Sequence, residues 1–176
     1  MSFFSGRRFL AFALCLFAAA GCGYTRKNAL PENYKSIYVK TVVNKIPIAE
    51  LIAYKPGLEI DITNAVVRRL QKDGNLTVAR SAEEADLVWE ADLTHFDQEG
   101  LRFSRLETTQ ELRNYLVLSM RLLEQSTGQV LWEERNFSGD ADYFVSQIRD
   151  HARDEAADQA VENLARNVVD RIVEDW

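Results

Sequence analysis

The side chains that most often perform acid, base or metal chemistry are sparse in this chain and lie far apart. It has two histidines, His95 and His151, and no pair or cluster with the spacing of a metal site. Three positions separate Asp92 from His95, so the two cannot point the same way on a regular strand. Two carboxylate pairs could act as general acid and base, but a solvated sheet face explains them better. They are Glu90 with Asp92, and Glu133 with Glu134.

Motifs of covalent and phosphate chemistry are missing as well. The chain has no Gly-x-Ser-x-Gly sequence and no glycine-rich run before a predicted helix. We therefore predict a binding or assembly protein without catalytic residues, metal ions or cofactors, and not an enzyme.

Two arginines, Arg102 and Arg105, are the main candidates for ligand binding because the rest of the chain is acidic. They lie beside the apolar side chains of Leu101 and Phe103. A guanidinium group makes bidentate contacts with phosphate, and the apolar neighbours could contact acyl chains. We predict a site for a phosphorylated, acylated amphiphile; the alternative is a hairpin tip that charge keeps soluble.

Cys22 is the third feature with a possible chemical role. Arg7 and Arg8 precede twelve apolar residues, 9–20, as in a secretory signal peptide, and the run is too short to span a membrane. Its end, Ala19-Ala20-Gly21-Cys22, resembles a bacterial lipobox with alanine in place of the usual leucine. The resemblance implies that Cys22 carries acyl chains that anchor the protein. An ordinary secretory site followed by a chance cysteine is the alternative.

The residues after this site indicate one acidic domain on a tether. Gly23 stands where aspartate would favour inner-membrane retention, so we expect the outer membrane. Cleavage before Cys22 leaves 155 residues, enough for one domain with a real core, and no free thiol for a disulfide. The 19 Lys and Arg against 27 Asp and Glu argue against a nucleic-acid partner. We predict a signal peptide at 1–21, a tether at 22–34 and a single domain at 35–176.

Hydrophobic periodicity predicts an α+β fold with the element order β, α, β, β, β, β, α. Residues 36–43 alternate, with Ile37, Val39, Thr41 and Val43 on one face and Tyr38, Lys40 and Val42 on the other. Residues 87–96 also alternate, which is typical of an antiparallel sheet with one wet face. Helical spacing covers 58–72, with a stop at 73–75, and 146–176. The other strands are predicted at 76–80, 115–124 and 129–137, with a turn at 81–86 and a long hairpin across 98–114.

The segment 44–57 is unusually apolar for a loop and contains two prolines. One interpretation is that its large side chains cap the core. The other is that they dock a protein partner, since exposed apolar patches mark interfaces. We predict Ile48, Leu51 and Tyr54 as the docking residues.

The order and spacing of several short motifs resemble the lipopolysaccharide-assembly lipoproteins of the LptE family. The resemblance covers nearly all of the chain after the signal peptide, and no single motif in it is specific. The motifs are Gly21-Cys22-Gly23-Tyr24, Ile37-Tyr-Val-Lys-Thr-Val-Val-Asn44, Gly57-Leu58-Glu59, Ile62-Thr63-Asn64-Ala65, Glu84-Ala-Asp-Leu87, Tyr115-Leu-Val-Leu118 and Gly128-Gln-Val-Leu-Trp-Glu133.

This resemblance implies a sheet covered on one face by two helices, which agrees with the mixed or antiparallel sheet of four to five strands that we predict from periodicity. It also implies an outer-membrane lipoprotein that plugs and supports the LptD β-barrel and assists lipopolysaccharide insertion. No motif carries over the lipopolysaccharide contacts, so Arg102 and Arg105 rest on chemistry alone. Two alternatives stay open: a tethered periplasmic module that activates a cell-wall synthase or another envelope complex, and a periplasmic hydrolase with converging carboxylates of perturbed pKa.

Overall fold

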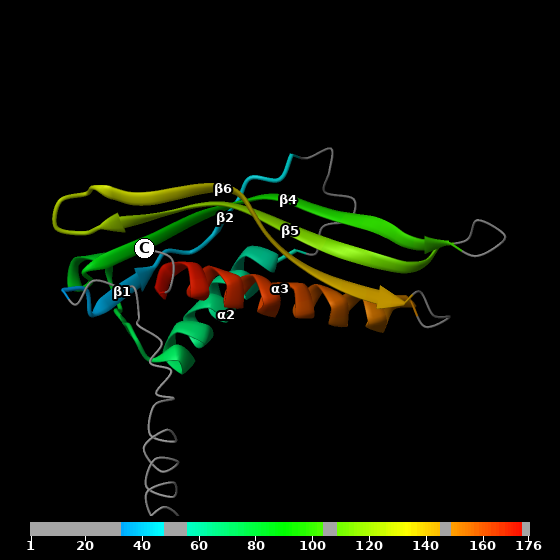
Figure 1. The fold of residues 1–176 in the computed structure, drawn as a ribbon, viewed down its shortest axis with the longest axis horizontal. Helices are drawn as coiled ribbons and strands as arrows, with labels where there is room; N and C mark the ends of the chain where they lie inside the picture. The colour runs from blue at the N-terminus through cyan, green and yellow to red at the C-terminus, as the bar shows by residue number, and fades with distance from the viewer. Residues whose placement is uncertain (1–32, 48–55, 104–108, 145–148, 174–176) are drawn as a thin grey trace, which may run out of the picture.

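One mixed β-sheet with two helices on one of its faces forms the framework of the protein (Figure 1). The computed structural model describes residues 33–47, 56–103, 109–144 and 149–173. Along the chain the elements are β1 (Ser36–Val39), β2 (Val43–Asn44), α2 (Leu58–Asp73), β3 (Thr77–Val78), a 3-10 turn (Ala82–Glu84), β4 (Leu87–Phe103), β5 (Thr109–Glu124), β6 (Val130–Phe144) and α3 (Arg149–Val173). The strand order is β3-β1-β4-β5-β6, and β2 also pairs with β4.

The predicted α+β class and the mixed sheet are confirmed. Strand β1 runs parallel to β3 and β4, whereas β4, β5 and β6 form an antiparallel meander. The sheet has six strands, slightly more than the four to five expected. The difference comes from the first predicted strand, which is divided into β1 and β2.

The division of that strand also corrects the predicted alternation. Val39 lies opposite Trp89 and Val43 opposite Asp92, so one extra residue is present on the β1–β2 side. An extra residue of this kind reverses which face the following side chains occupy. Val42 is therefore buried and Val43 is exposed, the opposite of the prediction.

A threonine of α2 fastens this irregular segment to the helix layer. The backbone N–H of Val42 donates a hydrogen bond to the Thr63 hydroxyl at 3.0 Å, and that hydroxyl donates to the Glu59 carbonyl at 2.7 Å. Buried N–H groups that leave a sheet need such partners. The bulge is thus satisfied from within the core.

The core lies between the helices and the inner face of the sheet. Strand β4 buries Leu87, Trp89, Ala91 and Leu93, as predicted from their alternation. Helix α3 contributes small and branched side chains at helical spacing, which lets it lie close to the sheet. The fully buried α3 residues are Ala160, Leu164, Ala165, Val168, Val169 and Ile172.

The helix limits follow their predicted signals. Helix α2 ends at Gly74, whose φ of 80° is in the left-handed region that glycine adopts without strain. Its N–H donates to the Leu70 carbonyl at 3.0 Å. The predicted stop at 73–75 is confirmed.

The start of β1 is fixed to the sheet by charged groups. The backbone N–H groups of Lys35 and Ser36 and the Ser36 hydroxyl all donate to Asp86 Oδ2, at 2.8, 2.9 and 2.8 Å. Led by the Lys35 N–H, these bonds hold the pKa of Asp86 below its usual value. The Tyr34 hydroxyl donates to Glu124 Oε1 at 2.9 Å. The described chain therefore enters at the end of the sheet where β5 turns into β6.

The β4–β5 hairpin points in the opposite direction (Figure 1). Strand β4 has 17 residues and β5 has 16, as the predicted hairpin required. At about 3.3 Å per residue, β4 is roughly 55 Å long. Strand β6 continues to Phe144, well beyond the predicted end at 137, because it pairs with β5 along most of its length. The chain's entry and the hairpin therefore lie at opposite ends of an elongated sheet.

Candidate functional site: the open face of the sheet

We call the face of the sheet that turns away from α2 and α3 the open face. In the described part of the chain, both helices pack on the other side (Figure 1). Among the residues that the structure describes, three large hydrophobic side chains are exposed: Val43 and Val130 at open-face positions, and Ile60 on α2. The open face is therefore the surface most suited to contact another molecule.

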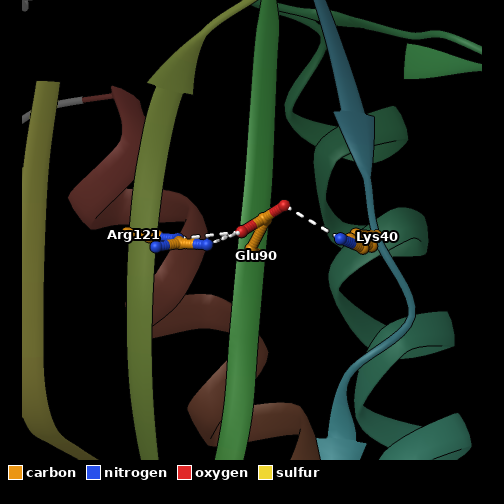
Figure 2. A network of polar contacts seen from close by, with 3 residues as sticks. All are labelled: Lys40, Glu90 and Arg121. Atoms are coloured by element: carbon orange, nitrogen blue, oxygen red, sulfur yellow. Dashed lines mark hydrogen bonds and ion pairs between the residues drawn. The ribbon is translucent and has the colours of Figure 1, made fainter. Parts of the chain in front are cut away.

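A row of alternating charges crosses the near half of this face, close to the chain's entry. We call Lys40, Glu90, Arg121 and Glu133 the charge ladder. Glu90 Oε1 accepts from Lys40 Nζ at 3.0 Å, and Glu90 Oε2 accepts from Arg121 Nη2 at 2.5 Å (Figure 2). Glu133 lies directly opposite Arg121 in the β5–β6 register. Lys40, which lies between β1 and β2, and the three strand residues alternate in the sign of their charge across the sheet.

The ladder keeps its carboxylate ionised. The side chain of Glu90 is only 22% exposed, and burial alone would raise its pKa. The hydrogen bonds from Arg121 and Lys40 outweigh burial and lower the pKa of Glu90 below its usual value. Donating this hydrogen bond to Glu90 correspondingly raises the pKa of Arg121. A carboxylate held in this state is a poor proton donor, which argues against the acid and base roles considered for Glu90 with Asp92.

A shallow hollow of about 340 Å³ lies over the ladder. Its floor includes Ala91, Asp92 and Ser119, and Val43 lines it from β2. Charged groups of both signs and the hydroxyls of Thr41 and Ser119 surround it. Such a lining suits polar contacts with a partner surface better than the enclosure of an apolar ligand.

An apolar row lies beside the ladder. Tyr38 is opposite Val88, Val88 is opposite Leu123, and Leu123 is opposite Val130 in the strand registers. Val88 is buried although neither α2 nor α3 covers this face, and Val130 is 41% exposed. The near half of the open face thus combines an apolar row with a charge-balanced row, as protein interfaces do.

The far half of the open face, toward the β4–β5 hairpin, is acidic. Arg113 Nη2 donates to Asp142 Oδ2 at 2.9 Å, and its guanidinium lies 5.9 Å from the centre of the Tyr115 ring. The bond from Arg113 lowers the pKa of Asp142. Four carboxylates occupy the positions opposite Arg113 and Tyr115: Asp97, Glu99, Asp140 and Asp142.

A bulge in β4 corrects the expected geometry of Asp92 and His95. The β4–β5 register shifts between Leu93 and His95, and both Leu93 and Phe96 are buried. His95 is exposed and Asp92 is half-buried, so both lie off the core face instead of on opposite faces. The prediction assumed a regular strand.

The second carboxylate pair is divided between two surroundings. Glu133 Oε1 accepts from Arg135 Nε at 2.9 Å. Glu134 accepts from Arg171 of α3, whose guanidinium lies 4.6 Å from the centre of the Trp132 ring. The two carboxylates therefore do not converge on one reacting group.

Most of the predicted binding residues lie outside the described residues. This applies to Cys22, Ile48, Leu51, Tyr54 and Arg105. Arg102 is within β4 opposite Glu111, and its side chain is also outside the description. Ile46, from the same apolar segment as Ile48, is buried at 7% exposure and packs on the core, which agrees with the capping interpretation at that position.

Two searches of the described residues bear on membrane and metal contacts. Across 33–47, 56–103, 109–144 and 149–173, no helix has the length and apolar character required to cross a bilayer. In the same residues, no three His, Cys, Asp or Glu side chains are grouped as they would be around a metal ion.

The charge ladder was missed by sequence reasoning. Lys40, Glu90, Arg121 and Glu133 are far apart along the chain and become neighbours only through the strand registers. The alternation in β4 and β5 indicates that Glu90 and Arg121 are both on the wet face. It does not show that they are neighbours, because the register between two strands cannot be read from either strand alone.

The fold recurs in solved structures of low sequence identity. Protein XCC0632 from Xanthomonas campestris has a TM-score of 0.56 at 16% identity, over 82% of this chain and 87% of that one. The hypothetical protein CT253 from Chlamydia trachomatis has a TM-score of 0.54 at 12% identity, over 79% and 95%. A minor lipoprotein from Acinetobacter baumannii has a TM-score of 0.50 at 12% identity, over 82% and 97%. No curated protein sequence matches the chain.

These structures define a class of α+β domains in which two helices cover one face of an elongated sheet. Within that class the family is specific. The model of the LptE family, described as lipopolysaccharide-assembly, matches residues 34–175. The chain belongs to the LptE family.

Proposed function

We propose that the protein is an outer-membrane lipoprotein that plugs and supports an LptD β-barrel and assists insertion of lipopolysaccharide into the outer leaflet. Membership of the LptE family supports the part in lipopolysaccharide assembly. The observation that carries the barrel partner is the near half of the open face, with its balanced charge ladder beside an apolar row.

The lumen of a large membrane barrel is polar and offers many hydrogen-bonding groups. A domain that occupies it needs a surface that is polar, ordered and close to neutral where the two touch. The ladder meets this need, because each charge has a neighbour of opposite sign and Glu90 is bonded from both sides. When the ladder loses water on contact with the polar lumen, the charge of Glu90 therefore stays paired.

The anchor is proposed at Cys22. With two or more acyl chains there the protein would stay firmly on the membrane. The lipobox resemblance supports this, and the same fold occurs in a lipoprotein of Acinetobacter baumannii. A Cys22→Ala variant is expected to leave the membrane fraction with its fold intact. Firm membrane attachment of this variant after cleavage would overturn the anchor.

The glycolipid contacts are proposed at Arg102 and Arg105. The acidic far half of the open face would repel lipopolysaccharide phosphates, so contact in this region depends on cations such as these. Replacing both by glutamate is expected to weaken binding of purified lipopolysaccharide, measured by titration of the full chain in detergent. Unchanged binding would remove them from the site.

The central experiment is purification of the full chain from its own membranes, followed by identification of what comes with it. We expect a large β-barrel protein in stoichiometric amount. Its consistent absence, with a peptidoglycan synthase recovered instead, would contradict the proposal and favour the tethered activator. A matched pair of variants localises the contact. Replacing the charged ladder residues by neutral ones should reduce recovery of the barrel protein. Neutralising the Arg68–Glu162 pair between the helices should leave that recovery unchanged.

Ile48, Leu51 and Tyr54 remain proposed docking residues for the same partner. Their replacement by serine tests them in the same purification. Recovery equal to that of the unchanged chain would exclude them.

A further inference from the structure

Strand β6 lies at the edge of the sheet, and an exposed edge strand can pair with a strand of another molecule. In the described residues β6 pairs with β5 on one side and with no strand on the other. An unpaired row of backbone N–H and C=O groups is a template for pairing with a strand of another molecule. Strand β6 has 15 residues, so this row of unpaired groups extends over most of the sheet's length.

The first half of β6 is protected by its own irregularity. The β5–β6 register shifts between Leu118 and Met120, and Asn136 has a φ of 61°, in the left-handed region that asparagine tolerates better than most residues. A bulge of this kind twists an edge and interrupts its row of hydrogen-bonding groups. From Phe137 onward the strand is regular, so the bulge cannot protect the second half.

Side chains of α3 reach the regular half. Asn163 Nδ2 donates to the Asp140 carbonyl at 2.8 Å, and Asn167 Nδ2 is 3.4 Å from the Ser138 carbonyl. Because Ser138 and Asp140 are two residues apart, their carbonyls point to the same side of the strand. That is the side away from β5, where a further strand would pair.

The spacing of these contacts matches two regular periods. Asn163 and Asn167 are one helical turn apart, which is about 6 Å along α3, and Ser138 and Asp140 are about 6.6 Å apart along β6. One more turn along α3 brings Arg171 to the Glu134 carboxylate and over the Trp132 ring. A stripe at four-residue intervals therefore follows the strand edge.

Gly139 makes this approach possible. A Cβ atom built there would lie 2.5 Å from Leu164 Cβ and 2.6 Å from Leu164 Cα, too close for any real side chain. Glycine thus lets the backbone of α3 lie against β6 between the two capped carbonyls. Leu164 directly follows Asn163, so the close approach and the first cap occur at the same turn of the helix.

We infer that Asn163, Asn167 and Arg171 form an edge guard that keeps β6 from pairing with β6 of a second copy of this chain. The two amides occupy the carbonyls that a new strand would use, and the arginine holds α3 against β6 through the side chains of Glu134 and Trp132. This role is independent of the proposed partner. It concerns the edge of the sheet, whereas the charge ladder concerns the open face.

The test is the association state of the full chain in detergent, with Asn163→Ala and Asn167→Ala combined. By sedimentation, we expect the unchanged chain to stay monomeric and the double variant to shift toward twice the protein mass as its concentration rises. Hydrogen exchange at the Ser138 and Asp140 amides, which share the free edge, should slow as the dimer forms. A folded double variant that stays monomeric at every concentration would overturn the inference.

Two further variants make the result specific. Asn64→Ala with Gln71→Ala removes two exposed amides of α2, a helix that does not pack on β6, and should leave the mass unchanged. Adding Ser138→Pro to the double variant removes an edge N–H and should restore the monomer, because proline is tolerated at a free edge and blocks pairing there. A dimer that persists with Ser138→Pro uses another surface and would also overturn the inference. If circular dichroism shows that the double variant is unfolded, Asn163→Ala alone provides the same comparison.

Discussion

The two faces of the sheet are built from the same strands, but one is formed by buried apolar side chains and the other by paired charges in contact with water. On the inner face, Trp89, Leu93 and Leu118 are fully buried against the helices. On the open face, Glu90 and Arg121, neighbours of buried residues in the chain, pair in contact with water. Burial of apolar area contributes most of the folding free energy, whereas exposed ion pairs contribute little each. The inner face therefore determines whether the protein folds, and the open face is free to determine what it contacts.

The largest difference between the two faces, in the unfolding free energy lost on substitution, should appear at neighbouring residues of β4. Trp89→Ala removes a fully buried side chain and is expected to cost about 3–5 kcal/mol of unfolding free energy. Glu90→Ala, one position away on the open face, should cost about 1 kcal/mol or less. Denaturant unfolding of both variants measures the contrast. Equal losses would mean that the open face is part of the core.

The close contact of α3 with β6 gives the next effect. Gly139→Ala places a Cβ into the backbone of Leu164, so strand and helix must separate, at a cost of about 1–3 kcal/mol. Ser138→Ala at the adjacent position is the control and should change stability little. If Gly139→Ala were neutral in thermal unfolding, the helix would not lie as close to the strand as described.

The attachment of β1 through Asp86 should give a smaller, pH-dependent effect. Asp86→Asn removes the charge that three hydrogen bonds stabilise, at a cost of about 1 kcal/mol near neutral pH. Because folding lowers the pKa of Asp86, its contribution is present above the unfolded pKa near 3.9 and is lost as pH falls through the folded value. The gap between the two proteins should therefore close below about pH 4. A difference in unfolding free energy between the two proteins that increased in acid would contradict this role of Asp86.

The ladder itself should contribute least to stability. A double-mutant cycle on Lys40 and Glu90, with glutamine at each position, is expected to give a coupling of about 0.2–1 kcal/mol that decreases with added salt. A coupling of several kcal/mol, unaffected by salt, would move Glu90 from the open face into the structural core.

The same contrast explains how far the sequence predicted the structure. Periodicity in 58–72 and 87–96 gave the helix and the inner face, because each pattern depends on neighbours in the chain. The bulges at Val42 and His95 were missed, since a bulge is set by the partner strand and by contacts such as the bond from Val42 to Thr63. The ladder and the edge guard were missed for the same reason: each joins residues that only the strand registers or the helix packing bring together.

The measurement that tests the account most directly compares partner recovery after neutralising two sets of ion pairs. In one variant Lys40, Glu90 and Arg121 become glutamine on the open face; in the other Arg68 and Glu162 become glutamine between the helices. Both proteins should keep unfolding free energies within about 1 kcal/mol of the unchanged chain. We predict that the first recovers much less of the barrel protein from its membranes and that the second recovers a normal amount. Equal recovery by both, or a loss confined to the helix variant, would contradict the assignment of the open face as the contact surface.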